Sequence, residues 1–324
     1  MTENKYKILP RILVLVIFVC ALVSYCEVRL RDVPNGYTIK RDNFEKQLGS
    51  IEALVLGSSQ SLYGIDPKYF SIKTYNLAEE SQSLYYDKEL LLKYIDKMPS
   101  LKIVFISVSY FSLWFEQYNA VENWRDAYYY KFWGINSNNP DESWLKKFSY
   151  IDLYGTSFSQ NALRKNFKVA LDKNPYENGW YNPADNDLTH GSPSFVPLPI
   201  SDSAAVTRVK LHNSQMKDEF LDRNQKYLDT LLAALVKRKI TIAIITPPVY
   251  KYYSAHTDAS KINIMHEVIK NLCDKYRCSY YDYFNDIRFL YEDFQDDNHL
   301  NPKGAAKLSG FLNNAVNMKT LKIP

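Results

Sequence analysis

Short apolar runs alternate with segments of helical periodicity along this chain. The runs are rich in β-branched and aromatic residues, as buried strands are, and lie at residues 51–57, 74–78, 101–108, 240–245 and 279–283. Apolar positions recur at helical spacing in residues 83–98, 216–236 and 258–276. A last helix begins at Asn301-Pro302, because Asn is a good N-cap and Pro suits the first helical position. The alternation predicts an α/β fold around a doubly wound parallel sheet of about five strands.

Residues 110–210 interrupt this alternation. The segment is rich in Tyr, Trp, Asn and Pro, and it includes Trp114, Trp133 and Trp180. We expect an insertion, helical in part, over the edge of the sheet where the strands end. Such a segment suits a substrate-binding lid. Aromatic residues equally form hydrophobic clusters that only pack, and the sequence leaves both roles open.

The N-terminal segment has the features of a membrane or export signal. Lys5, Lys7 and Arg11 precede an uncharged apolar run over residues 12–26. A basic leader favours a cytoplasmic N-terminus with the rest of the chain outside. An uncleaved membrane anchor is the favoured interpretation, and a cleavable signal peptide is the alternative. The expected divisions are an anchor or signal over 1–28, a juxtamembrane linker over 29–50, and one domain with its insertion over 51–324.

Composition narrows the class of protein. Of the 324 residues, 46% are hydrophobic, which is ample for a sizeable core. The net charge is +4 and the basic residues are dispersed, so we expect no nucleic-acid partner. The four cysteines form no zinc-ligand pattern with histidine, and no metal or cofactor is expected. Cys273 and Cys278 form a small disulfide loop if the domain is exported, or else two free thiols.

Two segments carry candidate chemistry. The first apolar run of the domain ends in Gly57-Ser58-Ser59, at a strand end where open α/β sheets bind ligands. Asp296 and His299 stand in an Asp-x-x-His pattern just before the final helix. A serine nucleophile needs a base for its proton and a carboxylate to orient that base. Each segment alone also fits an ordinary polar turn, but together they supply all three groups.

The two segments resemble the SGNH (GDSL-like) hydrolase superfamily, which has a flavodoxin-like three-layer fold. Its first block is Gly-Asp-Ser after strand one, and Gly57-Ser58-Ser59 is similar to the Gly-Ser-Ser variant of that block. Its last block is Asp-x-x-His. The resemblance therefore implies Ser59 as nucleophile, His299 as base and Asp296 as the carboxylate. Residues 56–67 and 299–304 resemble a membrane-anchored branch that includes alginate O-acetylation proteins and the teichoic-acid D-alanyl transfer protein.

The middle blocks depart from the family pattern. Ser81 stands where the family has a glycine whose backbone N–H helps to bind the oxyanion. Ser109 stands where the family has an asparagine side-chain donor. The resemblance implies the N–H groups of Ser59 and Ser81, with the Ser109 hydroxyl, as oxyanion donors. Loss of one such donor typically lowers the rate by about 10²–10³, so these substitutions bear directly on activity.

The resemblance implies an extracytoplasmic serine esterase or O-acyltransferase that works in O-acylation, chiefly acetylation, of an envelope or secreted polysaccharide. The implied partners are a glycan substrate, the membrane and a membrane-bound O-acyltransferase. The alternative is a catalytically inactive accessory protein that binds glycan or such an acyltransferase. The changed middle blocks favour the accessory protein, and the complete Ser59, His299 and Asp296 set favours the enzyme.

Overall fold

A five-stranded sheet forms the centre of the computed structural model, which describes residues 3–32, 35–141, 149–150, 177–181 and 200–317. All paired strands are parallel, and their order is β2-β1-β3-β4-β5. This is the flavodoxin-like order of doubly wound sheets. The strands are β1 Ala53–Leu56, β2 Thr74–Asn76, β3 Ile103–Ser107, β4 Thr241–Thr246 and β5 Ser279–Asp282. The predicted α/β fold and the parallel sheet are confirmed.

Helices cover both faces of the sheet. One face is packed by α2 Gly36–Gln47, α4 Leu84–Tyr94, α9 Leu221–Lys237 and α11 Ala259–Tyr276. The other is packed by α12 Pro302–Asn317, which contacts the short α3 Ser59–Gly64. Asn301 caps α12 as predicted, because its Oδ1 accepts the N–H groups of Lys303 (2.9 Å) and Gly304 (3.1 Å).

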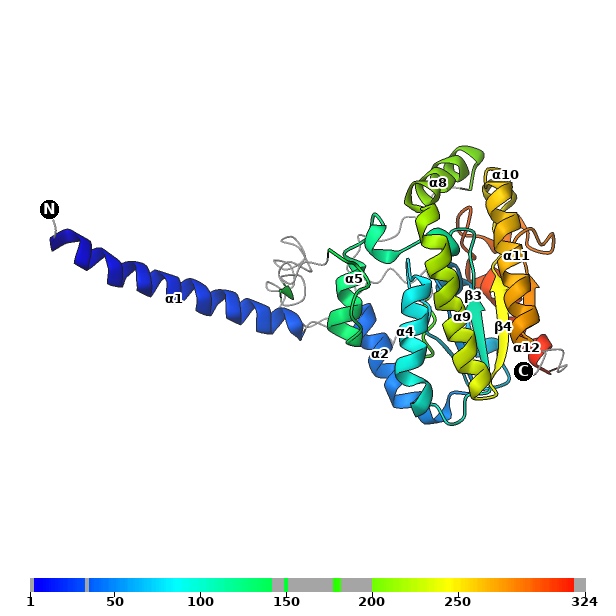
Figure 1. Cartoon of the computed structure of the whole chain (residues 1–324), viewed down its shortest axis with the longest axis horizontal. Helices are drawn as coiled ribbons and strands as arrows, with labels where there is room; N and C mark the ends of the chain where they lie inside the picture. The colour runs from blue at the N-terminus through cyan, green and yellow to red at the C-terminus, as the bar shows by residue number, and fades with distance from the viewer. Residues whose placement is uncertain (1–2, 33–34, 142–148, 151–176, 182–199, 318–324) are drawn as a thin grey trace.

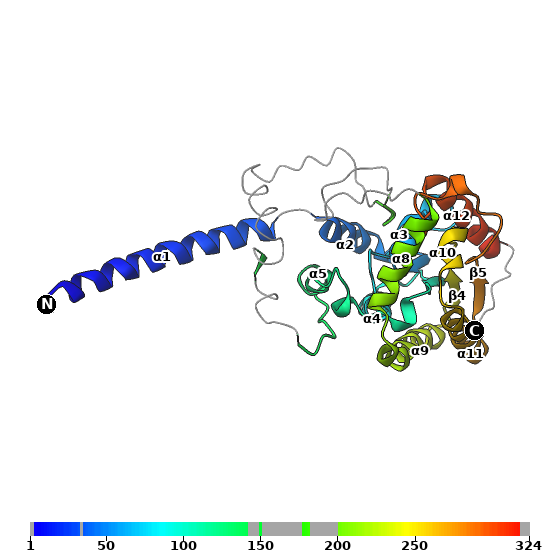
Figure 2. The same cartoon turned by 90° about the horizontal axis from the view of Figure 1, so that it is seen from above.

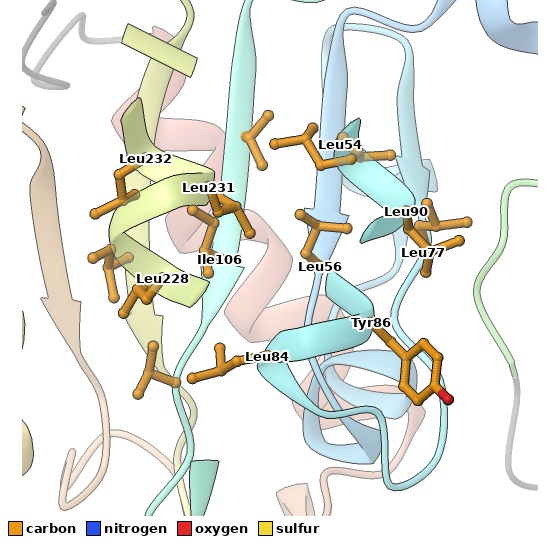
Figure 3. Close-up of a cluster of buried hydrophobic side chains, with 14 of the residues drawn as sticks. Leu54, Leu56, Leu77, Leu84, Tyr86, Leu90, Ile106, Leu228, Leu231 and Leu232 are labelled. Atoms are coloured by element: carbon orange, nitrogen blue, oxygen red, sulfur yellow. The ribbon is translucent and has the colours of Figure 1, made fainter. Parts of the chain in front are cut away.

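Alternate residues of each strand enter different cores. Leu54, Leu56 and Ile106 face α4 and α9, where they meet leucines of both helices (Figure 3). Val55, Phe105 and their neighbours face the opposite way, toward α12. Successive side chains of a strand point to opposite faces, so a strand covered on both sides must be apolar throughout. This burial explains why the strands are continuous apolar runs in the sequence.

The described residues form further helices and single turns besides those named above. The helices are α1 Glu3–Arg31, α5 Arg125–Tyr128, a π-helical turn over Tyr129–Trp133, α8 Asp202–Gln215 and α10 Lys251–Ala255. Single 3-10 turns lie at Leu48–Ser50, Pro67–Tyr69, Ile95–Lys97, Ser112–Trp114, Gln117–Asn119, Asp218–Phe220 and Tyr291–Asp293.

Helix α2 belongs to the globular domain, whereas the sequence suggested a linker over residues 29–50. Asn35 and Thr38 form a capping box, in which each side chain accepts the backbone N–H of the other. Tyr37, Lys40 and Phe44 of α2 are buried. Phe44 packs against Tyr75 of β2, with ring centroids 5.1 Å apart. The globular domain therefore includes α2, from Gly36 onward.

Helix α1 extends away from the α/β body (Figure 1). Its Ile8–Arg31 portion is long and apolar enough to cross a membrane, and most of its apolar side chains are exposed, whereas Leu30 near its end is buried in the core of the domain. A signal sequence near an N-terminus has the same length and composition. The helix thus has the length and composition of a membrane anchor or of a signal sequence.

The described part of the expected insertion packs mainly as core. Trp114, Tyr129 and Trp133 are buried in the same cluster as α4 and α9. Helix α8 lies over the edge of the sheet where the strands end (Figures 1 and 2). Residues 142–148, 151–176 and 182–199 lie outside the described residues. Elsewhere in the domain, Cys273 and Cys278 form a disulfide at the end of α11.

Candidate active site

The turn after β1 presents Ser59 at the first position of α3. Gly57 makes this turn possible, because its φ of 139° lies in a region that side chains disfavour. A Cβ on Gly57 would lie only 2.5 Å from the Cβ of Ser107 on β3. Beneath the turn, the buried carboxylate of Asp87 accepts hydrogen bonds from Gln82 and from the Gly57 N–H. Burial raises the pKa of Asp87 to about 7.

The structure brings Ser59 and His299 together from opposite ends of the domain. Ser59 Oγ lies 2.9 Å from His299 Nε2. His299 Nδ1 lies 2.9 Å from Asp296 Oδ2 and 3.1 Å from Asp296 Oδ1. With the carboxylate as acceptor, Nδ1 carries the ring proton and Nε2 is free to accept from Ser59. The three residues therefore form a continuous hydrogen-bonded chain.

The neighbouring serines do not share this geometry. Ser58 Oγ lies 3.4 Å from Ser109 Oγ, and Ser61 is fully buried with no hydrogen bond from its hydroxyl among the described residues. Ser59 is partly exposed, and its hydroxyl is the one bonded to the histidine. The geometry singles out Ser59, the serine indicated by the sequence resemblance.

Asp296 is held as a buried acceptor. Its Oδ1 accepts the backbone N–H groups of Asn298 (3.0 Å) and His299 (2.8 Å), and Arg208 Nη2 lies 3.7 Å from Oδ2. Burial acts to raise the pKa of Asp296, but the interactions with His299, Arg208 and the Asn298 N–H outweigh it, and the pKa lies below its usual value. The carboxylate therefore stays ionised beside the imidazole at neutral pH.

Helix α3 also fixes the histidine. The Tyr63 ring stands edge-to-face against the His299 ring, with centroids 5.2 Å apart and planes at 88°. Gln60 Nε2 donates to the Asn298 carbonyl at 3.1 Å and ties α3 to the histidine loop. Gln60, Tyr63 and Arg208 were not among the site residues expected from the sequence. Helical spacing from Ser59 places Tyr63 on the same face, but no local signal identifies Arg208.

Two backbone N–H groups of the site remain available. The N–H of Ser59 and the N–H of Ser81 donate to no residue that the structure describes. Ser81 has a φ of 53°, in the left-handed region where glycine is usual. The serine thus keeps a backbone conformation typical of glycine at this position, which answers the question raised by the missing glycine.

Ser109 lies beside the turn that carries Ser59. Its Oγ lies 3.4 Å from Ser58 Oγ, and its backbone N–H donates to Ser112 Oγ at 2.9 Å. The described residues therefore give two free N–H groups and one nearby hydroxyl.

Two further titratable groups border the hydrogen-bonded chain. Burial, together with the charges of Arg208 and His299, lowers the pKa of His212 to about 3, and its Nδ1 lies 2.5 Å from Tyr253 Oη. Burial and the neighbouring Asp296 raise the pKa of Asp297 to about 6. His212 is therefore neutral at physiological pH. Among the described residues, no group of three His, Cys, Asp or Glu side chains is arranged to hold a metal ion.

Comparison with known proteins gives distant likenesses only. No protein-family model and no curated protein matches the sequence. Among solved structures, the chain is similar to a provisionally named acylhydrolase of Bacteroides fragilis, with 10% identity, a TM-score of 0.42, and coverage of 86% of this chain and 94% of that one.

Two other solved structures are similarly distant. One is a GDSL-like lipase of Bacteroides thetaiotaomicron, with 9% identity, a TM-score of 0.42 and coverage of 88% and 99% of the two chains. The other is a Streptococcus pneumoniae protein provisionally named as a platelet activating factor, with 11% identity, a TM-score of 0.41 and coverage of 94% and 99%. Likenesses at this level carry no argument about activity, which must come from the site itself.

Proposed function

We propose that this chain is an SGNH-type serine esterase or O-acyltransferase. The observation that carries the proposal is the Ser59–His299–Asp296 hydrogen-bonded chain, with distances of 2.9 Å at both links. It stands where the strands end, which is the ligand-binding edge of such sheets. Two available N–H groups lie on the segments that surround it. The site thus offers a candidate for each of the nucleophile, the base, the orienting carboxylate and the oxyanion donors.

The first half-reaction forms an acyl-serine. His299 Nε2 takes the proton of Ser59 Oγ as the oxygen attacks the carbonyl carbon of an ester. The N–H groups of Ser59 and Ser81 stabilise the negative charge on the carbonyl oxygen. His299 then gives its proton to the departing alkoxide, and the alcohol leaves. Asp296 stabilises the imidazolium and keeps Nδ1 protonated throughout.

The second half-reaction determines whether the enzyme is an esterase or a transferase. Water or a sugar hydroxyl attacks the acyl-serine while His299 Nε2 accepts its proton. The tetrahedral intermediate then breaks its bond to Ser59 Oγ, which takes the proton back from His299 Nε2, and an acid or a new ester is released. The sequence resemblance favours acetyl transfer to an envelope or secreted polysaccharide, with α1 as the membrane anchor and the domain outside the cytoplasm. The Cys273–Cys278 disulfide supports this placement, since structural disulfides persist in oxidising compartments.

The test begins with a serine-reactive fluorophosphonate on the full-length chain in mild detergent. Wild type should be labelled covalently, and Ser59→Ala should not be labelled. His299→Ala should be labelled far more slowly, because general-base assistance contributes roughly 10²–10⁴. Ser58→Ala is the matched control, and it should keep most of the labelling. Labelling of Ser59→Ala equal to that of wild type would refute the proposed nucleophile.

A transfer assay separates the two activities. Acetyl esters with a chromogenic leaving group are supplied with and without an oligosaccharide acceptor, and acetate and acetylated sugar are measured together. A transferase should divert product from acetate to sugar as acceptor concentration rises. An esterase should release acetate at a rate that the sugar does not change.

The accessory-protein alternative loses one of its supports. It drew on the replacement of a family glycine by Ser81, yet Ser81 adopts the left-handed backbone that glycine would have. The remaining support is Ser109, whose side chain is shorter than the family's asparagine. Absence of both labelling and ester turnover in the wild type would favour the accessory protein.

A further inference from the structure

Ser81 adopts a costly backbone conformation and is held there by its side chain. Its φ of 53° is uncommon for any residue other than glycine, asparagine or aspartate. Its hydroxyl donates to Glu122 Oε2 at 3.1 Å. Glu122 comes from the aromatic insertion, far along the chain from Ser81. The side chain that creates the steric cost therefore also supplies a contact that offsets it.

Arg125 binds two carboxylates next to Ser81: that of Glu80, the preceding residue, and that of Glu122, which accepts from the Ser81 hydroxyl. Its Nε lies 2.8 Å from Glu122 Oε2, and its Nη2 also forms an ion pair with Glu80. Arg125 is fully buried, and the planar guanidinium presents several N–H donors in a rigid fork. One cation thus fixes the residue before Ser81 and the partner of the Ser81 hydroxyl.

The same segment is attached to the nucleophile turn and to the histidine. The Glu79 N–H donates to the Gly57 carbonyl at 3.2 Å. Glu80 also accepts from the hydroxyl of Tyr63, whose ring packs against His299. A change in the path of residues 79–81 would therefore reach both the turn that carries Ser59 and the ring of His299.

We propose that Glu122 and Arg125 are positioning residues that hold Ser81 in its left-handed conformation and so aim its N–H at the oxyanion. The inference rests on the proposed function. If it is correct, the described part of the insertion contributes to the rate of the reaction as well as to the packing of the core. In a glycine-bearing site the left-handed conformation needs no such support, because glycine adopts it without steric cost. Here the support is built from two charged residues of the insertion.

A double-mutant cycle tests the coupling on the full-length chain, with a chromogenic acetyl ester as substrate. Glu122→Gln should lower kcat by roughly tenfold at nearly unchanged KM, which is part of the 10²–10³ that a lost donor costs. In a Ser81→Gly background, which has neither the hydroxyl nor the steric cost, the same change should lower kcat by less than about threefold. Coupling of this kind identifies residues that act together.

Matched variants separate positioning from folding. Glu89 on α4 is about as exposed as Glu122 and forms an ion pair with Lys88. Glu89→Gln therefore removes a comparable carboxylate away from Ser81, and it should leave kcat unchanged. Ser81→Ala keeps the Cβ and loses the bond to Glu122, so it should reproduce the loss, and adding Glu122→Gln should not deepen it. Arg125→Lys keeps the charge but not the fork, and it should also lower kcat. All variants are compared at equal folded fraction by thermal unfolding.

The outcomes are distinct. An equal fall in kcat in the wild-type and Ser81→Gly backgrounds, or no fall in either, overturns the inference while the labelling of Ser59 stands. If Arg125→Lys keeps the full kcat, the proposed positioning role of Arg125 is refuted. A wild-type chain that neither turns over ester nor reacts with fluorophosphonate refutes the proposed function, and the inference falls with it. A kcat effect confined to the background that keeps Ser81 supports the inference.

Discussion

Replacing Gly57 by alanine tests the claim that the turn after β1 positions the nucleophile. The added Cβ would meet Ser107 Cβ at 2.5 Å, whereas carbon atoms in contact prefer about 3.5–4.0 Å. The end of β1 must then move by roughly 1 Å away from β3. The two strands are paired up to Leu56 and Ile106, so the movement disturbs the last pairs of the sheet.

Two costs add in this variant. A side chain at a φ of 139° is strained by about 1–3 kcal/mol. Overpacking the junction with Ser107 costs about another 1–3 kcal/mol. The free energy of unfolding should therefore fall by about 2–6 kcal/mol, and the Tm by roughly 3–10 °C. In the folded fraction, a displacement of about 1 Å should slow the reaction of Ser59 by roughly 10².

The assay combines urea unfolding with the rate of fluorophosphonate labelling. Gly49→Ala is the control, because a Cβ there meets nothing within 4 Å, and its stability should change by at most about 1 kcal/mol. A Gly57→Ala chain that loses less than about 1 kcal/mol and reacts at the wild-type rate would refute the reasoning. It would mean that the turn tolerates a side chain and does not constrain Ser59.

Three further predictions concern single features of the domain. Asp296→Asn should lower kcat by about 10²–10⁴ at similar KM, since an amide does not hold the required tautomer; unchanged kcat would exclude the carboxylate. Burial raises the pKa of Asp87 to about 7. The folded state therefore holds a proton that the unfolded state has released between about pH 4 and 7. Urea unfolding should show wild-type stability falling as pH rises through this window, and Asp87→Asn should lack that component. Replacing Cys273 and Cys278 by alanine should lower the free energy of unfolding by about 2 kcal/mol without changing kcat, because the disulfide closes a short loop; a thiol titration checks that the wild type has the bond.

The sheet was predictable because its signal is local. Strands β1 and β3 are buried on both faces, so the apolar runs at 51–57 and 101–108 contain them in full. The N-cap of α12 was predictable for the same reason, since Asn301 bonds residues two and three positions ahead. The Ser59 and His299 pair lies 240 residues apart. It was accessible only because each partner stands in a short recognisable pattern.

The supports of the site were not predictable from local patterns. Charged residues such as Lys40 gave the sequence of α2 the character of a polar linker. The Lys40 side chain is nevertheless buried, and its ammonium group donates to the Ala78 carbonyl and lies 3.7 Å from the Glu79 carboxylate. Ser81 contradicts the glycine rule for left-handed backbone, and its partner Glu122 lies in an unrelated stretch. Arg208 reaches Asp296 from α8. Each of these contacts joins residues that are brought together only by the tertiary fold. Hydrophobic periodicity and local propensity carry no information about such pairs.

The short connection between α1 and α2 limits how far the domain can lie from a membrane that holds α1. Helix α1 ends at Arg31 and α2 begins at Gly36 as part of the core. At about 3.6 Å per residue, the residues between them extend to no more than roughly 18 Å. If α1 stays in a bilayer, the domain therefore remains close to the membrane surface and diffuses along it. Under the proposed function, substrates carried on that surface would then meet the site at high effective concentration, whereas chains released into the surroundings would not.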